Sequence, residues 1–331
     1  MASSKFRAIL GLVLLATLVS CAGRIRQPAP SFRHPIITTG YFSLRPSMRL
    51  PYRVWRPKGR PQAMVLALHG FNDSRDAFAM PGPAFAAAGI LLVAPDQQGF
   101  GAAPGRGHWP GTAVLLADAR KMLAELHDKH PRIPLVLMGE SMGAAETLLL
   151  AAQGDADVAS YILVSPAVWG GTAMAPPLRI AAALAGTLAP NVRLTGRQAH
   201  IRASDNTAAL IALSEDPLTI VATRLGAVAG LVRLMGRAQA ACHDFAPPHA
   251  LVLYGGHDEL IPKSAMARCW RAMPADPGVV LAYYPEDYHL MLLDHQRAIP
   301  TRDIIDFILH PNHALPSEAA INGLIFIAEH P

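Results

Sequence analysis

Ser141 stands at the centre of the pentapeptide Gly139–Gly143. The apolar run Leu135–Met138 precedes it, and a helix-like stretch, Ala144–Ala152, follows. A buried strand that turns this sharply into a helix lifts a serine hydroxyl into the open. Glycine is needed two residues before and after the serine, because a side chain there would clash in so tight a turn. The pattern therefore predicts a nucleophilic serine.

A serine hydroxyl is a poor nucleophile at neutral pH, so it needs a base and an acid that orients the base. Asp258 follows the apolar run Leu251–Tyr254, and His289 follows the run Val279–Tyr284. Catalytic groups of open α/β sheets gather at the carboxyl ends of the strands. We therefore expect Ser141, Asp258 and His289 to form a catalytic triad.

Two other residues compete for these roles. His295 is the alternative base, but it begins a helix-like stretch rather than following a strand. Asp287 is the alternative acid, but it lies only two residues from His289, whereas Asp258 has a loop of its own. We favour His289 and Asp258.

The elements that position these residues follow from the hydrophobic pattern. Buried strands appear as short apolar runs, and helical periodicity between them indicates a mostly parallel sheet with helices on both faces. Tyr41–Arg56 is expected to supply leading antiparallel strands, Thr112 to cap a helix, and Thr301–His310 to form the closing helix. The runs are Met64–Leu68, Ile90–Ala94, Leu135–Met138, Tyr161–Val164, Leu251–Tyr254 and Val279–Tyr284.

Together these motifs resemble the α/β-hydrolase superfamily, in particular the serine hydrolases that include monoacylglycerol lipases and lysophospholipases. The resemblance covers about Tyr41 to His310. Leu68–Phe71 resembles the oxyanion loop of that family, and Asp96–Gly101 resembles its Asp-x-Arg-Gly-x-Gly loop, with Gln98 in place of the usual arginine. The resemblance implies an eight-stranded, mostly parallel sheet with an inserted helical cap.

The resemblance also implies roles for backbone groups near Ser141. The N–H groups of Phe71 and Met142 would form the oxyanion hole, because one donor follows the nucleophile and the other comes from the loop after the first long strand. His69 belongs to that loop motif and is expected to shape it rather than to act as a base.

The recurring apolar runs that indicate strands are missing between residues 168 and 246. We therefore expect a core of residues 41–167 and 247–310 with a cap at 168–246. Residues Val168–Ala240 contain seven arginines and three acidic residues. This positive balance favours the binding of anionic head groups; the alternative is that these charges simply form a solvated helical face. Trp169, at the entrance to the cap, and His108 and Trp109 are candidate substrate-lining residues, although Trp109 also fits a buried loop anchor. Residues 311–331 stay unassigned.

Residues 1–20 have the order of a secretory signal peptide: Lys5 and Arg7, an apolar middle and a small-residue end. The ending Leu18–Cys21 resembles a bacterial lipobox, which implies lipidation of Cys21 and an outer-membrane lipoprotein facing the periplasm. Cleavage after Ala22 or Gly23 is the alternative. Residues 21–40 are expected to be a tether.

Composition excludes several classes of function. The chain has 331 residues, 51% apolar and 16% charged, which suits a large folded core. Its net charge of +5 includes two from the signal peptide and has no dense basic run, so nucleic acid is not an expected partner. We expect neither metal nor cofactor. Cys242 and Cys269 form a disulfide or stay two buried thiols.

The sequence therefore predicts an exported enzyme that hydrolyses carboxylic esters through an acyl-serine intermediate. Monoacylglycerol-like or lysophospholipid-like lipid esters are the expected substrates. Acyl transfer or thioester hydrolysis with the same triad is one alternative. A non-catalytic binding module of the envelope is the other, which the intact serine, acid and histidine argue against.

Overall fold

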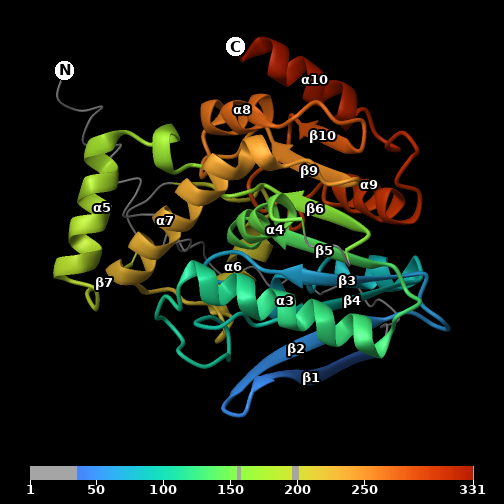
Figure 1. Cartoon of the computed structure of the whole chain (residues 1–331), viewed down its shortest axis with the longest axis horizontal. Coiled ribbons are helices and arrows are strands. Elements are labelled where there is room, and N and C mark those ends of the chain that lie inside the picture. Colours follow the sequence, from blue (N-terminus) through green and yellow to red (C-terminus); the bar gives the residue numbers. More distant parts are fainter. Residues whose placement is uncertain (1–35, 155–157, 196–200, 331) are drawn as a thin grey trace.

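The computed structural model describes residues 36–154, 158–195 and 201–330. Its centre is an eight-stranded sheet in the order β1-β2-β4-β3-β5-β6-β9-β10, in which all pairs from β4 to β10 are parallel and β2 runs antiparallel to both its neighbours (Figure 1). This topology confirms the expected α/β-hydrolase fold. The strands are β1 (Ile36–Arg45), β2 (Met48–Arg56), β3 (Ala63–Leu68), β4 (Ile90–Pro95), β5 (Leu135–Glu140), β6 (Ser160–Val164), β9 (Ala250–Gly255) and β10 (Val279–Tyr284).

Helices cover both faces of the sheet, so every residue of β3, β4, β5, β6 and β9 is buried. Alternate side chains of one strand enter two separate cores, as in β3, where Met64 and Leu66 face one and Val65 faces the other. One core is packed by α3 (Thr112–Lys129), α4 (Met142–Ala152) and α8 (Lys263–Ala272). The other is packed by η1 (Arg75–Phe78), α2 (Gly82–Ala87) and α9 (Ala298–Leu309).

The inserted segment between β6 and β9 lies within residues 168–246, which we call the cap. Its long helix α7 lies between α5 and α4 and packs against both (Figure 1). The cap elements are η2 (Gly171–Ala173), α5 (Pro176–Leu188), β7 (Arg193–Leu194), α6 (Thr207–Glu215), β8 (Thr223–Arg224), α7 (Leu225–Ala241) and η3 (Cys242–Asp244).

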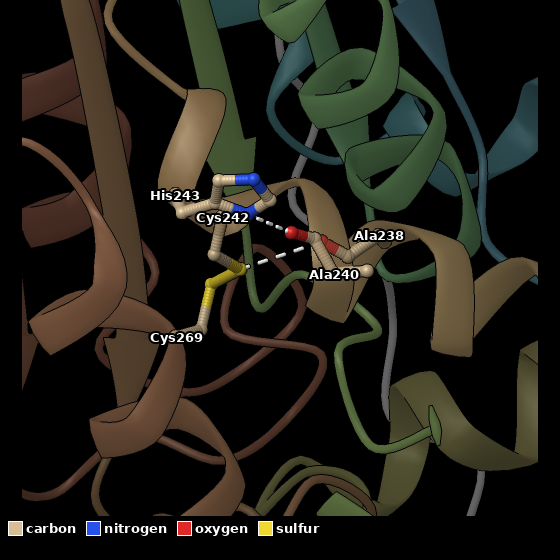
Figure 2. The surroundings of a disulfide bond; sticks show 5 residues. All are labelled: Ala238, Ala240, Cys242, His243 and Cys269. Carbon is tan, nitrogen blue, oxygen red and sulfur yellow. Dashed lines mark hydrogen bonds between the residues drawn. A yellow bond between two sulfur atoms is a disulfide. The ribbon is translucent and has the colours of Figure 1, made fainter. Parts of the chain in front are cut away.

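A disulfide joins the cap to the core. Cys242, which follows α7, is bonded to Cys269 of α8 (Figure 2). Both cysteines are fully buried. The structure thus decides between the disulfide and the two free thiols that the sequence left open.

Three predictions about element ends are corrected or completed. β1 begins at Ile36, so residues 36–40 are strand rather than tether, because they pair with residues 52–56 of β2. The N-cap of α3 is Gly111 rather than Thr112, since the chain enters this helix at φ 102°, a conformation that favours glycine. The unassigned residues 311–331 contain α10 (Ala319–Glu329), which packs on β10.

The predicted signal peptide and Cys21 lie outside the described residues. Among the helices in the ranges that the structure describes, none is both long enough and apolar enough to cross a bilayer.

Candidate active site

Ser141 occupies the sharp turn between β5 and α4, with φ 53° and ψ −107°. A side chain rarely adopts this backbone conformation. The two flanking glycines are required by contact: a Cβ on Gly139 would lie 2.2 Å from the carbonyl carbon of Gly143, and one on Gly143 would lie 2.2 Å from Leu68 O. The Ser141 N–H donates to Val164 O at 2.9 Å, which fixes the turn to the neighbouring strand.

The hydroxyl of Ser141 begins a line of hydrogen bonds that runs into the protein. It lies 2.9 Å from His289 Nε2, and His289 Nδ1 lies 2.7 Å from Asp258 Oδ2. The carboxylate accepts the Nδ1 proton, which leaves Nε2 free to accept from Ser141. Three side chains from separate loops at the carboxyl edge of the sheet are therefore arranged as nucleophile, base and acid.

Asp258 is held by its own loop. Its Oδ1 accepts the backbone N–H groups of Leu260 and Ile261, both at 2.8 Å, so that Oδ2 stays turned toward His289. The competing residues lie elsewhere. His295 is exposed and its backbone N–H donates to Asp205, and the carboxylate of Asp287 accepts no hydrogen bond within the described part of the chain.

The loop after β3 lies next to Ser141. A Cβ on Gly70 would lie 3.5 Å from Ser141 Cβ, so the backbone of this loop approaches the nucleophile closely. Phe71 follows Gly70, and Met142 is the first residue of α4, where the N–H has no acceptor within the helix. Both predicted oxyanion donors therefore belong to segments next to Ser141.

His69 has a structural place in the same loop. It is fully buried, its Nδ1 donates to Gly70 O at 2.7 Å, and its Nε2 accepts from Gln97 N–H at 3.0 Å. Burial lowers the pKa of His69, which keeps the ring neutral and suited to one donated and one accepted bond. Gln97 Nε2 also donates to His69 O. The loop after β3 is thus tied to the loop after β4.

The departure at Gln98 is offset by another arginine. Gln98 accepts from Arg45 on β1, and the buried carboxylate of Asp96 forms its ion pair with Arg75 of η1. Asp96 also accepts the N–H groups of Arg75 and Ala102. The loop therefore keeps a salt bridge although arginine is missing from its motif.

A strap of the cap, residues 216–224, crosses over the loop after β3. Asn72 is buried at φ 66°, and its side-chain amide donates to Thr223 Oγ1 at 2.5 Å. The backbone repeats the link, because Ile220 N–H donates to Asn72 O at 2.8 Å. Arg106 holds the strap from the other side by donating to Pro217 O and Thr219 O.

The three predicted substrate-lining residues differ in position. Trp109 is half-buried between the core and the cap: its ring centroid lies 6.4 Å from that of Phe71, and a Cβ on Gly230 of α7 would lie 2.2 Å from its Cγ. His108 is exposed and accepts from Arg224 of the cap. Trp169 is half-buried against the larger core. Trp109 is thus placed next to Phe71 of the oxyanion loop.

Several buried acids surround the elbow. Burial, aided by the charges of Asp73 and Asp294, raises the pKa of Glu140 well above its usual range. Burial likewise raises the pKa of Asp73 to about 7 and is the largest cause of the raised pKa of Asp294. Burial thus disfavours a second negative charge beside Ser141. In the described ranges, no group of three His, Cys, Asp or Glu side chains is placed to hold a metal ion.

The comparison with known proteins decides the family. Residues 59–296 match the family described as serine aminopeptidase, S33, a span that contains Ser141, Asp258 and His289. The chain belongs to the S33 family. It is a serine hydrolase of the lipase and esterase type.

Relatives named as monoacylglycerol or monoglyceride lipases match most of this S33 chain. The monoacylglycerol lipase of Mycolicibacterium smegmatis is 27% identical over 273 residues, covering 79% of this chain and 93% of its own. The human monoglyceride lipase is 26% identical, and the match covers 72% of this chain and 79% of the human protein. The solved structure of a soluble Saccharomyces cerevisiae monoglyceride lipase variant, in complex with a substrate analog, is similar with a TM-score of 0.72 and 20% identity, covering 87% and 100%. That structural likeness shows the fold.

The residues that sequence reasoning missed are those that join loops. Asn72, Gln97 and Thr223 make the contacts that hold the loop after β3. An Asn directly after the oxyanion motif is a signal for a left-handed turn position, since Asn is enriched there. Its partner in the cap, 151 residues away, has no local signal.

Proposed function

We propose that this protein hydrolyses carboxylic esters through an acyl-serine intermediate. The observation that carries the proposal is the line from Ser141 Oγ to His289 Nε2 and from His289 Nδ1 to Asp258 Oδ2, at 2.9 and 2.7 Å. These distances are those of an activated nucleophile whose base is held by an acid.

In the proposed reaction Ser141 Oγ attacks the ester carbonyl carbon while His289 Nε2 takes the hydroxyl proton. The negative oxygen accepts hydrogen bonds from the N–H groups of Phe71 and Met142, each worth about 3 kcal/mol in the transition state. The alcohol leaves with the proton from His289. Water then attacks the acyl-serine, gives its proton to His289, and releases the carboxylic acid and free Ser141.

For the substrate we propose a lipid ester with one acyl chain, of the monoacylglycerol or lysophospholipid kind. The names of the relatives support the first choice. The apolar surfaces of Phe71 and Trp109, beside the loop that would bind the oxyanion, support an acyl chain. Acyl transfer and thioester hydrolysis use the same triad and stay as alternatives, as does a non-catalytic binding module.

The decisive experiment is labelling of the purified protein with a fluorophosphonate probe, followed by mass spectrometry of the labelled peptide. We expect label on Ser141 and none on the Ser141→Ala variant. Ser165→Ala is the matched control, because Ser165 is also a serine with positive φ at the end of a central strand. A folded protein that takes no label would leave the binding module as the better interpretation.

A substrate panel separates the enzymatic alternatives. It compares 1-monooleoylglycerol, lysophosphatidylcholine, an oleoyl thioester and, because of the family name, an aminoacyl anilide, each with and without added glycerol as acceptor. We expect fatty acid release from the glyceride or the lysolipid. Faster turnover of the thioester, a transferred acyl chain or cleavage of the anilide would assign the triad to a different reaction.

We also propose that the protein is exported and anchored through a lipid on Cys21. The disulfide supports export, since disulfides persist in oxidising compartments such as the periplasm. Expression in a Gram-negative host with labelled palmitate tests the anchor. We expect label in the membrane fraction and a Cys21→Ser variant without it; equal labelling of both proteins would exclude lipidation at this residue.

A further inference from the structure

Helix α10 is apolar on both its inner and its outer face. Glu329 is its single charged residue. Ala319, Gly323 and Phe326 are buried against the sheet. On the outer face three large side chains are exposed: Ile321 (61%), Leu324 (69%) and Ile325 (49%). A helix with apolar residues all round is normally covered on every side.

Helix α10 cannot rotate so that its outer face turns toward the sheet. A Cβ on Gly323 would lie 2.0 Å from Leu281 O, so the helix backbone rests directly on β10. The ring of Phe326 is stacked on Tyr283 with centroids 4.7 Å apart and meets the edge of Trp270 at 5.3 Å. Rotation of α10 would break these contacts, so Ile321, Leu324 and Ile325 stay turned outward.

Unpaired basic residues border this helix. Neighbouring α8 carries exposed Lys263, Arg268 and Arg271 and no acidic residue. Arg268, Arg271 and His330 line a cavity of 430 Å³ where α8 meets the end of α10. Within the ranges that the structure describes, none of these basic side chains forms an ion pair.

We propose that the α8–α10 face, consisting of Ile321, Leu324, Ile325, Arg268 and Arg271, docks on an anionic phospholipid membrane. Apolar side chains of an interfacial helix enter the boundary between head groups and acyl chains. Arginines bind lipid phosphates with paired hydrogen bonds and are attracted by the negative surface. Charge complementarity thus selects the occupant of the face.

A second copy of the chain fits this face less well. In a twofold contact the same surface meets itself, which would bring Arg268 and Arg271 of one molecule toward those of the other. Like charges facing each other cost binding energy. Helix α10, which supplies the three apolar residues of the face, follows the family match of residues 59–296. Docking here is independent of the proposed esterase activity.

The test is cosedimentation of the full chain, carrying Cys21→Ser to remove any anchor, with vesicles of phosphatidylglycerol and phosphatidylcholine or of phosphatidylcholine alone. We expect binding to the anionic vesicles. Arg268→Gln with Arg271→Gln should weaken it about 30-fold. Leu324→Ser with Ile325→Ser should weaken binding at least 10-fold.

Matched controls lie at the other edge of the sheet. Lys58→Gln with Arg60→Gln removes the same charge from the turn between β2 and β3, and Ile37→Ser removes an exposed apolar side chain from β1. We expect both control proteins to bind like the parent, and all variants to keep the parent's melting temperature and its activity on a water-soluble ester.

Three outcomes would overturn the proposal: no binding of the parent, equal binding to neutral vesicles, or equal losses in the control variants. Sedimentation velocity without lipid tests whether a second copy of the chain binds to this face instead. A dimer that Leu324→Ser with Ile325→Ser converts to monomer would assign the face to a second copy.

Discussion

The side-chain amide of Asn72 donates a 2.5 Å hydrogen bond to Thr223 Oγ1, which joins the loop beside the nucleophile to the cap. Both side chains are buried. Asn72 directly follows Phe71, the proposed oxyanion donor. The position of the cap strap and the geometry of the oxyanion loop are therefore coupled through Asn72, to which Ile220 N–H also donates.

Replacing Thr223 by Val keeps the shape of the side chain and removes the hydroxyl. We expect kcat for a soluble ester to fall about 10- to 100-fold, since small misplacements in a catalytic site have effects of this size, while KM changes little. Thr223→Ser should restore most of the rate. A rise in KM with unchanged kcat would show that Thr223 contacts substrate instead of positioning the loop.

Asp258→Asn should lower kcat by roughly 10⁴-fold with little effect on folding, because the asparagine no longer fixes the required tautomer of His289. Steady-state kinetics and circular dichroism measure the two effects. Asp287→Asn is the control, since Asp287 lies two residues from His289 but outside the hydrogen-bonded line. Similar losses in both variants would contradict the assignment of the acid.

Gly139→Ala should destabilise the protein by about 3 kcal/mol or more, because the new Cβ would meet the backbone of Gly143 rather than a side chain that can move. Gly59→Ala is the comparison: Gly59 has φ 93° in open space, so alanine there costs only the backbone conformation, about 1–2 kcal/mol. Urea unfolding gives both values. A smaller loss at Gly139 than at Gly59 would mean that the elbow relaxes.

Stability should depend on pH through Asp73. Burial raises its pKa to about 7 from an ordinary value of 3.8, so between these values the folded state holds a proton that the unfolded state has lost. Asp73 therefore makes the free energy of unfolding fall as pH rises through this window, by on the order of 3 kcal/mol between pH 5 and 8. Asp73→Asn should reduce the measured decline by this contribution, while the decline caused by the raised pKa of Glu140 stays. Exposed Asp128→Asn should leave the measured decline unchanged.

Loss of the disulfide should cost about 3–4 kcal/mol, the loop entropy expected for a sequence separation of 27 residues. Urea unfolding of Cys242→Ala with Cys269→Ala, and of the parent with and without dithiothreitol, measures this cost. The reductant should have no effect on the double variant. Equal midpoints for the oxidised parent and the double variant would show that the bond contributes no stability.

Local patterns predict much of this fold and candidate site. Apolar runs such as Leu135–Met138 lie in buried strands because burial on both faces demands continuous apolar sequence. Ser141, Asp258 and His289 each stand in the loop that follows such a run, so the edge they share can be inferred before their contacts are seen. Chain order then supplies their separate roles.

Contacts between distant residues could not be predicted in this way. The partner of Asn72 is 151 residues away in the cap, and no sequence pattern around Thr223 predicts this contact. The start of β1 at Ile36 depends on pairing with β2, although the prolines and arginines before it suggest a tether. Helix α10 lacks the amphipathic period that marks surface helices, because its outer face is apolar too.

The two ends of the cap leave the core side by side. A Cβ on Gly170 would lie 2.2 Å from the backbone N of Gly236, and shortly afterwards Cys242 is bonded to Cys269 (Figure 2). The roughly sixty residues between these glycines therefore behave as a cassette with fixed attachment points. Such a cassette can diverge, or be exchanged between homologues, as long as its strap keeps the contact of Thr223 with Asn72. Acyl preference can then evolve separately from the hydrolytic chemistry.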